Sequence, residues 1–270
     1  MQKMRAQTFG LLHQVVVEFR LFWRSRQTLY LAFLVPMMCM ALLVYLNREG
    51  MLGSVFGALF RGLGQGEARL NGVSPMTLMT VGLIVYCIID VAFESMVPKL
   101  VRERTAGIYK RLGGTPLQSW VFLVAKTLTA SFIILVEVVL ILAVGLVSAD
   151  ITVAGSWWLL GIILLQGTFT AAALGFALSG VTASADGAVV AVHAIYIPML
   201  FLCGAFIPVE ALPKALQVVA HAIPLTYFVG PFRSVMVEGV GLKGVIGDLL
   251  ILLAWLLGGW IVAVKTFRWE

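Results

Sequence analysis

The sequence predicts an all-α membrane protein with six transmembrane helices. Of its 270 residues, 61% are hydrophobic and only 12% are charged, whereas an ordinary soluble domain has about 25% charged residues. The hydrophobic residues form long runs, and about 20 apolar residues in a helix cross the hydrocarbon core of a bilayer. These segments must be helical, because an open strand in lipid leaves backbone groups unpaired. We therefore expect a single transmembrane domain over residues 1–270.

Six apolar runs are long enough to serve as these spans. An even number of spans places both ends of the chain on the same side of the membrane. With the ends inside, the cytoplasmic segments hold most of the 19 Lys and Arg residues, as the positive-inside rule requires. We therefore expect cytoplasmic termini and spans at residues 29–46, 76–97, 120–148, 157–181, 187–207 and 245–264.

The residues before the first span predict an amphipathic helix at residues 10–27. At helical spacing, Leu12, Val16, Phe19 and Trp23 fall on one face. A basic helix with an aromatic apolar face usually lies flat in the membrane interface. The alternative is a plain cytoplasmic extension of the first span.

Two external loops differ in composition. The first, residues 47–75, is rich in glycine, and we expect a flexible cap rather than a folded domain. The second, residues 208–244, carries prolines between apolar stretches that are each too short to cross the membrane. We expect two short helices there, at residues 215–222 and 227–237, which lie at the outer leaflet or dip into it.

The charged segment of residues 99–116 is the strongest indication of function. It lies between two spans and holds five of the 19 Lys and Arg residues, which is too much charge for lipid. Val101, Ile108, Tyr109 and Leu112 still give it a small apolar side. The pattern predicts a short amphipathic helix over about residues 101–112 on the cytoplasmic face, suited to receive force or a signal from a partner protein.

The sequence lacks the motifs of an ATP-binding or catalytic protein. No G-x-x-x-x-G-K-[ST] occurs, so the chain cannot hold nucleotide phosphates in a P-loop. Gly239, Gly241 and Gly244 form a G-x-G-x-x-G, but no strand precedes it, and chance explains it better. The three histidines are dispersed and suggest no metal cluster. We therefore expect no enzymatic activity, no metal and no cofactor on this chain, and no nucleic-acid binding.

Three acidic residues lie within predicted spans, where charge is costly and usually faces protein or water. Asp90 and Glu94 are four residues apart and share a helical face near the cytoplasmic end of the second span. They either reach cytoplasmic water or pair with the region of Arg102 and Arg104. Glu137 lies near the middle of the third span, where it lines a substrate path, relays a proton or makes an interhelical hydrogen bond.

The fourth predicted span carries a small residue at every fourth position, which lets another helix approach closely. Such a stripe commonly packs within one chain, and the alternative is a dimer interface. Its members are Gly167, Ala171, Gly175 and Ser179.

Two segments carry an ordered series of motifs. The first follows the second span and consists of Arg102-Glu103-Arg104, Gly107, Lys110-Arg111-Leu112 and Thr115-Pro116-Leu117. The second follows the fifth span and includes Gly204-Ala205-Phe206-Ile207-Pro208, Leu212-Pro213, Leu216-Gln217, Pro224-Leu225-Thr226-Tyr227 and Arg233. Together they resemble the permeases of type-2 ATP-binding-cassette (ABC) exporters, a family that includes bacterial drug and polysaccharide or teichoic-acid exporters. One departure is Ile108, where the family often has Thr.

This resemblance implies an assembly and a mechanism. Two identical chains form a transmembrane dimer in the bacterial cytoplasmic membrane, and two separate ABC ATPase subunits carry Mg-ATP. Residues 101–112 become a coupling helix seated in a groove of the ATPase, and residues 208–244 form an outer gate. The implied coupling residues are Arg102, Glu103, Arg104, Gly107, Tyr109, Lys110, Arg111 and Leu112. The implied path or gate residues are Glu137, Phe206, Pro208, Tyr227 and Phe228.

The sequence therefore predicts the permease of an ATP-driven exporter for an amphipathic or lipid-linked substrate. An amphipathic drug, a lipid-linked glycan and a lipid all fit the pattern. The alternative is a proton-coupled secondary transporter that uses Glu137, Asp90 and His193. Because exposed charges contribute little to stability, we expect the Glu103 and Arg104 side chains to be dispensable for folding.

Overall fold

The computed structural model describes residues 13–21, 23–24, 26–62, 74–114, 119–148 and 151–266. These residues form helices joined by short connections and contain no strand, which confirms the predicted all-α class. In chain order the elements are α2 (Arg26–Arg48), α3 (Met51–Gly62), α4 (Pro75–Ile89), η2 (Asp90–Ser95), α5 (Met96–Thr105), α6 (Ile108–Gly113), α7 (Ser119–Ser148), α8 (Trp157–Val181), α9 (Ala185–Leu202), η3 (Val209–Ala211), α10 (Lys214–His221), α11 (Thr226–Arg233), η4 (Ser234–Glu238) and α12 (Leu242–Thr266).

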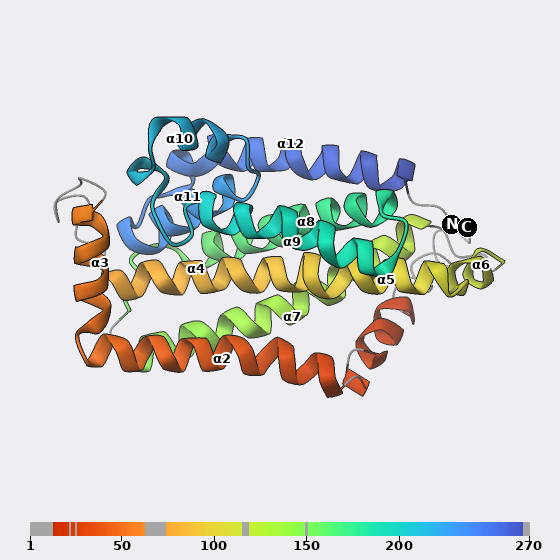
Figure 1. Cartoon of the computed structure of the whole chain (residues 1–270), viewed down its shortest axis with the longest axis horizontal. Helices are drawn as coiled ribbons and strands as arrows, with labels where there is room; N and C mark the ends of the chain where they lie inside the picture. The colour runs from red at the N-terminus through yellow and green to blue at the C-terminus, as the bar shows by residue number, and fades with distance from the viewer. Residues whose placement is uncertain are drawn as a thin grey trace.

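The long helices run side by side along the long axis of the molecule, with α3 and α10 toward one end and α6 at the other (Figure 1). Two apolar helix pairs are bent, by 87° between Ala32–Arg48 and Met51–Ala58 and by 99° between Lys214–His221 and Thr226–Glu238. The helices that are long and apolar enough to cross a membrane unbroken are Pro75–Thr105, Val121–Ser148, Trp157–Val181, Ala185–Leu202 and Leu242–Thr266. The described residues therefore belong to a multi-pass membrane protein.

Helix α8 occupies the centre of the bundle and packs most extensively along α12. It also contacts α4, α5, α7 and α11. Small residues of α8 let its neighbours approach closely. The Cα of Gly167 lies against the ring of Phe228, and that of Gly175 lies against the backbone carbonyl of Ala92. Ala171 and Ser179 are buried as well. The stripe in the fourth span therefore packs within the chain.

The second span is a helix of 31 residues that widens in its middle into the π-helical segment η2. Pro98 has no backbone N–H to bind the carbonyl of Glu94, and its ring crowds that carbonyl. Loss of an i→i−4 bond in this way favours a local π-helical turn. The π-helical turn carries both Asp90 and Glu94.

The expectation of a single helix over residues 101–112 is wrong, because the structure has two helices there. Helix α5 extends the second span to Thr105, and α6 begins at Ile108. Between them Gly107 adopts a φ of +71°, a conformation that residues with a Cβ adopt only at a cost. The amphipathic spacing continues through this glycine, but the backbone turns there.

The outer loops bring two further corrections. Residues 51–62, expected to belong to a flexible cap, form α3, and Leu52 and Phe56 bury one turn of it. The fifth span, expected to continue to residue 207, ends at Leu202 because Gly204 turns the chain with a φ of +88°. The two short helices expected in residues 208–244 are present as α10 and as α11 with η4. Residues 63–73 lie outside the described part of the first loop.

The expected amphipathic helix at residues 10–27 is helical at positions 13–21 and 23–24, and Leu12 lies outside the described residues. Val16 and Trp23 are exposed, whereas the ring of Phe19 packs edge-on against Phe132 of α7 at a centroid distance of 5.4 Å. One side of this N-terminal helix therefore attaches to the bundle, and an apolar side remains uncovered.

Candidate functional site

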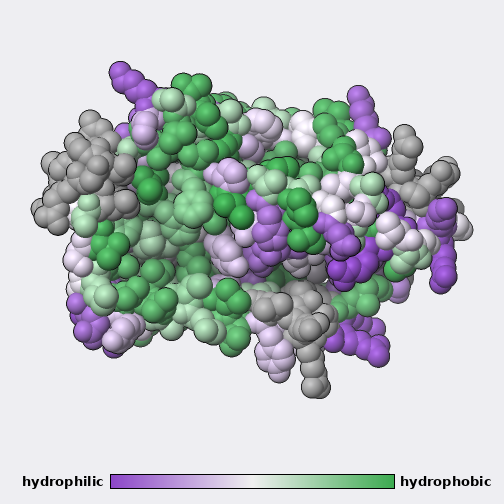
Figure 2. Space-filling view, in the orientation of Figure 1, coloured by the Kyte–Doolittle hydropathy of each residue, from purple (hydrophilic) through white to green (hydrophobic). Residues whose placement is uncertain are grey.

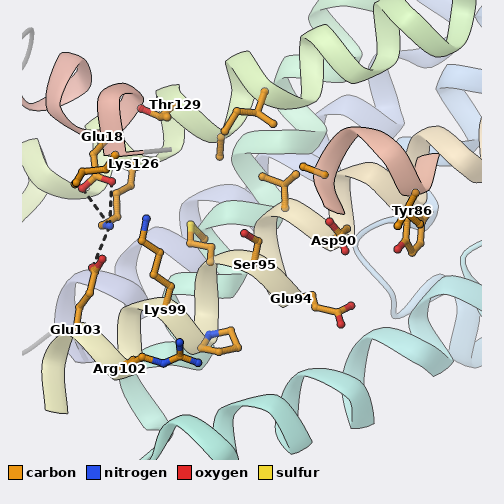
Figure 3. Close-up of a pocket in the computed structure, with 18 residues that line it drawn as sticks. Glu18, Tyr86, Asp90, Glu94, Ser95, Lys99, Arg102, Glu103, Lys126 and Thr129 are labelled. Atoms are coloured by element: carbon orange, nitrogen blue, oxygen red, sulfur yellow. Dashed lines mark hydrogen bonds and ion pairs between the residues drawn. The ribbon is translucent and has the colours of Figure 1, made fainter. Parts of the chain in front are cut away.

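A buried group of charges joins three parts of the chain beside α6. Lys126, near the start of α7, is only 6% exposed, and its Nζ lies 3.1 Å from Oε1 of Glu18 and 3.2 Å from Oε2 of Glu103. Burial of an ammonium group is costly unless it is paired. The two carboxylates provide that pairing, so the N-terminal helix, the end of α5 and the start of α7 meet at one ammonium group (Figure 3).

Tyr109 connects α6 to the same group. Its hydroxyl donates a hydrogen bond to Oε2 of Glu103 at 2.9 Å, and its ring meets that of Phe122 edge-on at a centroid distance of 5.3 Å. The Nζ of Lys126 lies 5.0 Å from the centre of the same Phe122 ring. Burial and the nearby Glu103 carboxylate raise the pKa of Tyr109, so its hydroxyl keeps the proton that it donates.

Arg104 fastens the end of α5 to the end of α8. Its guanidinium donates to the backbone carbonyl of Ser179 at 3.0 Å and also to that of Thr182. The last carbonyls of a helix have no partner within the helix, and a cation there also interacts favourably with the helix dipole. Arg104 therefore caps α8.

The remaining charges of the segment point outward. Arg102, Lys110 and Arg111 are exposed, and the side chain of Ile108 is exposed among them. Gly107 has open space around its Cα. The backbone of Leu112 continues α6, and its side chain lies outside the described atoms. The segment thus has a basic outer surface with one apolar residue and an inner surface held by ion pairs and hydrogen bonds.

This geometry corrects the expectation that Glu103 and Arg104 are exposed charges. Both bind partners in other helices, and the side chain of Glu103 is only 20% exposed. Sequence reasoning also missed Glu18, Phe122 and Lys126. A lysine inside the apolar run that begins α7 was the available signal, because such a residue needs an acidic partner.

The acidic residues of the spans differ in their partners. Glu94 lies 3.5 Å from Nε2 of His193 in α9, rather than pairing with Arg102 or Arg104, and Asp90 lines the same cavity as Glu94. Glu137 is 1% exposed, and neither carboxyl oxygen makes a hydrogen bond within the described part of the chain. Of these acidic residues, Glu94 is thus the one that contacts His193.

The expected gate residues lie at the end of the bundle that carries α10. Phe228 is fully buried against Gly167 of α8, and a Cβ on Gly82 of α4 would lie 2.6 Å from the ring of Phe206. The hydroxyl of Tyr227 donates to the carbonyl of His221 at 2.8 Å, which ties α11 to α10. Pro208 precedes the short turn η3. Two aromatic rings therefore sit directly on glycines of the spans.

Comparison with known protein families identifies the family of this chain. The family model described as ABC-2 type transporter matches residues 14–237, which include α2 and every later element through α11. The chain belongs to the ABC-2 type transporter family. The resemblance found in the motifs is thereby confirmed.

Two Escherichia coli (strain K12) proteins are similar to this ABC-2 chain. The probable multidrug ABC transporter permease YbhR is 24% identical over 165 residues, which are 61% of this chain and 42% of YbhR. The inner membrane transport permease YhhJ is 25% identical over 174 residues, which are 63% of this chain and 46% of YhhJ. The chain thus covers less than half the length of either relative.

Family membership also bears on the expected chemistry. The membrane subunit of the ABC-2 family is non-catalytic and carries no cofactor, which confirms both expectations for this chain. The roles assigned to the coupling and gate residues stay predictions. What the geometry adds is their division into residues that hold the bundle together and residues that a partner can reach.

Proposed function

We propose that the chain is the transmembrane permease subunit of an ATP-driven ABC exporter that moves an amphipathic or lipid-linked substrate. Its family membership and its similarity to a protein named as a probable multidrug permease support this function over the secondary-transporter alternative. In this proposal a separate ATPase subunit that holds Mg-ATP supplies the energy, as membership of the ABC family implies.

The observation that carries the proposal is the two-sided segment formed by the end of α5 and α6. Its outer surface offers Lys110 and Arg111 to a partner. Its inner surface is joined through Glu103 and Tyr109 to Lys126. A push by the ATPase on the outer surface is transmitted to α7 and to the N-terminal helix, because the paired charges resist separation.

The assembly that we propose contains two ATPase subunits and a second, identical permease chain in the bacterial inner membrane. Both termini are cytoplasmic in this arrangement. That orientation puts α6 in the cytoplasm with the ATPase, and α3 and α10 at the outer side. YhhJ, by its name an inner membrane permease, supports the location.

The outer gate in this proposal comprises residues 208–244 together with Phe206. Phe228 and Phe206 close the path by their contacts with Gly167 and Gly82, while Pro208 and Tyr227 set the positions of the short helices. Glu137 lines the path from α7 when the helices separate. Its carboxyl group is buried beside the thiol of Cys87 and has no cationic partner in the described structure, which supports a role in a second conformation.

A test of the coupling assignment reverses charge on the outer surface only. Lys110→Glu with Arg111→Glu is compared with Lys214→Glu and Lys243→Glu, exposed lysines at the other end of the bundle. The second pair belongs to the proposed outer gate, so it is the control for retention of the ATPase only. In membranes that contain the ATPase, the first pair is expected to reduce its retention and the substrate-dependent ATP hydrolysis by about tenfold, since a buried charge contact at an interface contributes on the order of 1.4 kcal/mol or more. Equal retention in the two pairs would contradict the assignment.

A further inference from the structure

The cavity between α2, the second span and α7 has a volume of about 880 Å³. Pockets of about 300 to 1,000 Å³ hold molecules of drug or lipid-headgroup size. Ala32 and Val35 of α2, Val91 of the second span, and Ala130 and Ile133 of α7 give it apolar walls. Those walls suit an alkyl or acyl tail, and the charged residues of the cavity lie beyond them.

The charged side chains divide the cavity into two ends (Figure 3). Tyr86, Asp90 and Glu94 lie at one end, and Lys99 and Arg102 lie toward the other. Figure 2 shows hydrophilic residues over the junction of α4 and α5, next to the hydrophobic left part of this face. We propose that this cavity binds an amphipathic zwitterion, a molecule that carries an amine, an acidic group such as a phosphate, and an apolar tail.

The acidic end is suited to an amine. Oε1 of Glu94 lies 3.5 Å from Nε2 of His193. Asp90, in contrast, makes no ion pair with any described side chain. Both carboxylates are partly buried, and the half-buried ring of Tyr86 lies one turn from Asp90. Carboxylates form strong charge-assisted hydrogen bonds to an ammonium, and an aromatic face attracts a cation.

The basic end is suited to an acidic group. Lys99 and Arg102 are exposed and pair with no carboxylate among the described residues. Lys126, Glu18 and Glu103 also lie in the wall of the cavity, and this paired group has a net charge of −1. With Lys99 and Arg102 this end of the cavity therefore keeps a net charge of +1. An arginine fork binds phosphate or carboxylate in a bidentate manner, and a lysine adds a mobile point charge.

The spacing of the two ends favours one molecule with both charges. Glu94 and Lys99 lie on one continuous helix, and five residues correspond to a rise of about 7.5 Å. The long Lys and Arg side chains shorten that gap, so an amine and a phosphate of one headgroup can reach both ends. A simple cation or a simple anion is attracted by one end and repelled by the other.

Such a zwitterion is either the transported substrate or a phospholipid that stays bound from the membrane. The inference goes beyond the proposed function, because it assigns a ligand to a cavity that the coupling and gate proposals do not use. Its test is independent as well, because binding is measured on the permease chain without any ATPase. Failure of coupling to an ATPase therefore leaves the cavity proposal untouched, and loss of binding leaves the coupling proposal untouched.

The experiment uses the full chain in a non-ionic maltoside detergent with three probes that carry the same label on hydrocarbon tails of equal length. The probes are lysophosphatidylethanolamine as the zwitterion, lysophosphatidylglycerol as the anion and a long-chain alkylamine as the cation. The zwitterion is expected to bind at least about tenfold more tightly than the other two, since each charged contact contributes on the order of tenfold. Equal affinities, or tightest binding of the amine or of the anion, overturn the proposal.

Paired variants locate the two ends. Asp90→Asn with Glu94→Gln, and separately Lys99→Gln with Arg102→Gln, are each expected to weaken zwitterion binding by about tenfold or more. The matched control is Arg48→Gln with Glu49→Gln, which removes one exposed charge of each sign outside both the cavity and the proposed gate and is expected to bind normally. If a charge variant elutes as an aggregate, Val35→Trp fills the cavity without altering a charge and must weaken binding. Unchanged binding in Val35→Trp and in the folded charge variants refutes the site.

The source of the ligand is then read from the complex with its ATPase. A zwitterion that stimulates ATP hydrolysis and crosses a vesicle membrane is the substrate. A zwitterion that co-purifies without transport is a resident lipid. Both results keep the binding site, because both require selective occupation of the same cavity.

Discussion

The Nζ of Lys126 lies 3.1 Å from Oε1 of Glu18, although the two residues are 108 positions apart in the chain. Both side chains are less than one tenth exposed. The N-terminal helix is therefore tied to α7 by a buried ion pair in addition to the contact of Phe19 with Phe132. Motion of either element is transmitted to the other.

Removal of the lysine tests the strength of this tie. Lys126→Met keeps the length of the side chain but leaves Glu18 and Glu103 buried without their cation, which is expected to lower the free energy of unfolding by about 3 kcal/mol. The measurement is urea unfolding in detergent micelles. Lys126→Arg serves as the control and should recover most of the loss; a change below about 1 kcal/mol in Lys126→Met would contradict the pairing.

Tyr109 allows coupling to be separated from folding. Tyr109→Phe removes the hydrogen bond to Glu103 but keeps the ring on Phe122, so the expected cost is about 1 kcal/mol. Because Glu103 loses one of its two tethers, substrate-stimulated ATP hydrolysis by the complex should fall several-fold while the permease still assembles.

Tyr109→Ala is the informative companion of that variant. It removes a buried ring as well, and loss of a buried aromatic side chain costs about 3 to 5 kcal/mol. In stability, Tyr109→Phe should thus be close to the wild type. In coupling, it should be as impaired as Tyr109→Ala. Normal coupling in Tyr109→Phe would show that the hydrogen bond transmits nothing.

Arg104 predicts a local effect at the end of α8. In Arg104→Ala the carbonyls of Ser179 and Thr182 lose their donor, and the last turn of the helix is expected to fray. Hydrogen exchange of the backbone amides in residues 178–182, which bond within the last turn of α8, should accelerate by about tenfold, as expected for the loss of about 1.4 kcal/mol of local stability. Arg102→Ala, on the exposed side of the same helix, should leave these amides protected; acceleration in both variants would mean that Arg104 is not the cap.

The spans could be predicted from the sequence because long apolar runs specify a helix without reference to the rest of the fold. Their ends could not. The positive φ of Gly204 ends α9 at Leu202, and the positive φ of Gly107 divides the charged segment. Local hydrophobicity does not record where a glycine turns the backbone, so both elements were predicted too long. The buried turn of α3 at Leu52 and Phe56 was hidden among glycines for the same reason.

The candidate site was predicted only on its outer side. Arg102, Lys110 and Arg111 were recognised as basic residues on a cytoplasmic segment, and these are the exposed ones. The inner side depends on Glu18 and Lys126, whose proximity is a product of helix packing across more than 100 residues. No spacing along the chain contains that information, although a lysine within an apolar run predicts that some acidic partner exists.

The contact of Gly167 with Phe228 gives a prediction for the outer gate. A Cβ on Gly167 would collide with the ring of Phe228, and that ring is fully buried and has no room to rotate away. Gly167→Ala is therefore expected to displace α11 and to lower the free energy of unfolding by about 1 to 3 kcal/mol. Gly161 offers a matched control in the same helix, since a Cβ there meets open space, and Gly161→Ala should stabilise α8 by up to about 1 kcal/mol.

The collision itself is tested by a compensating change. Leucine is smaller than phenylalanine, so Phe228→Leu makes room for the new methyl group. The double variant Gly167→Ala with Phe228→Leu should therefore lose less free energy of unfolding than the sum of the losses in the two single variants. Unfolding of all four proteins in detergent gives the coupling between the two sites. Strict additivity would mean that the methyl group finds space elsewhere and that Phe228 is not held by Gly167. A non-additive recovery, together with altered export in Gly167→Ala, would place the seat of the gate at this contact.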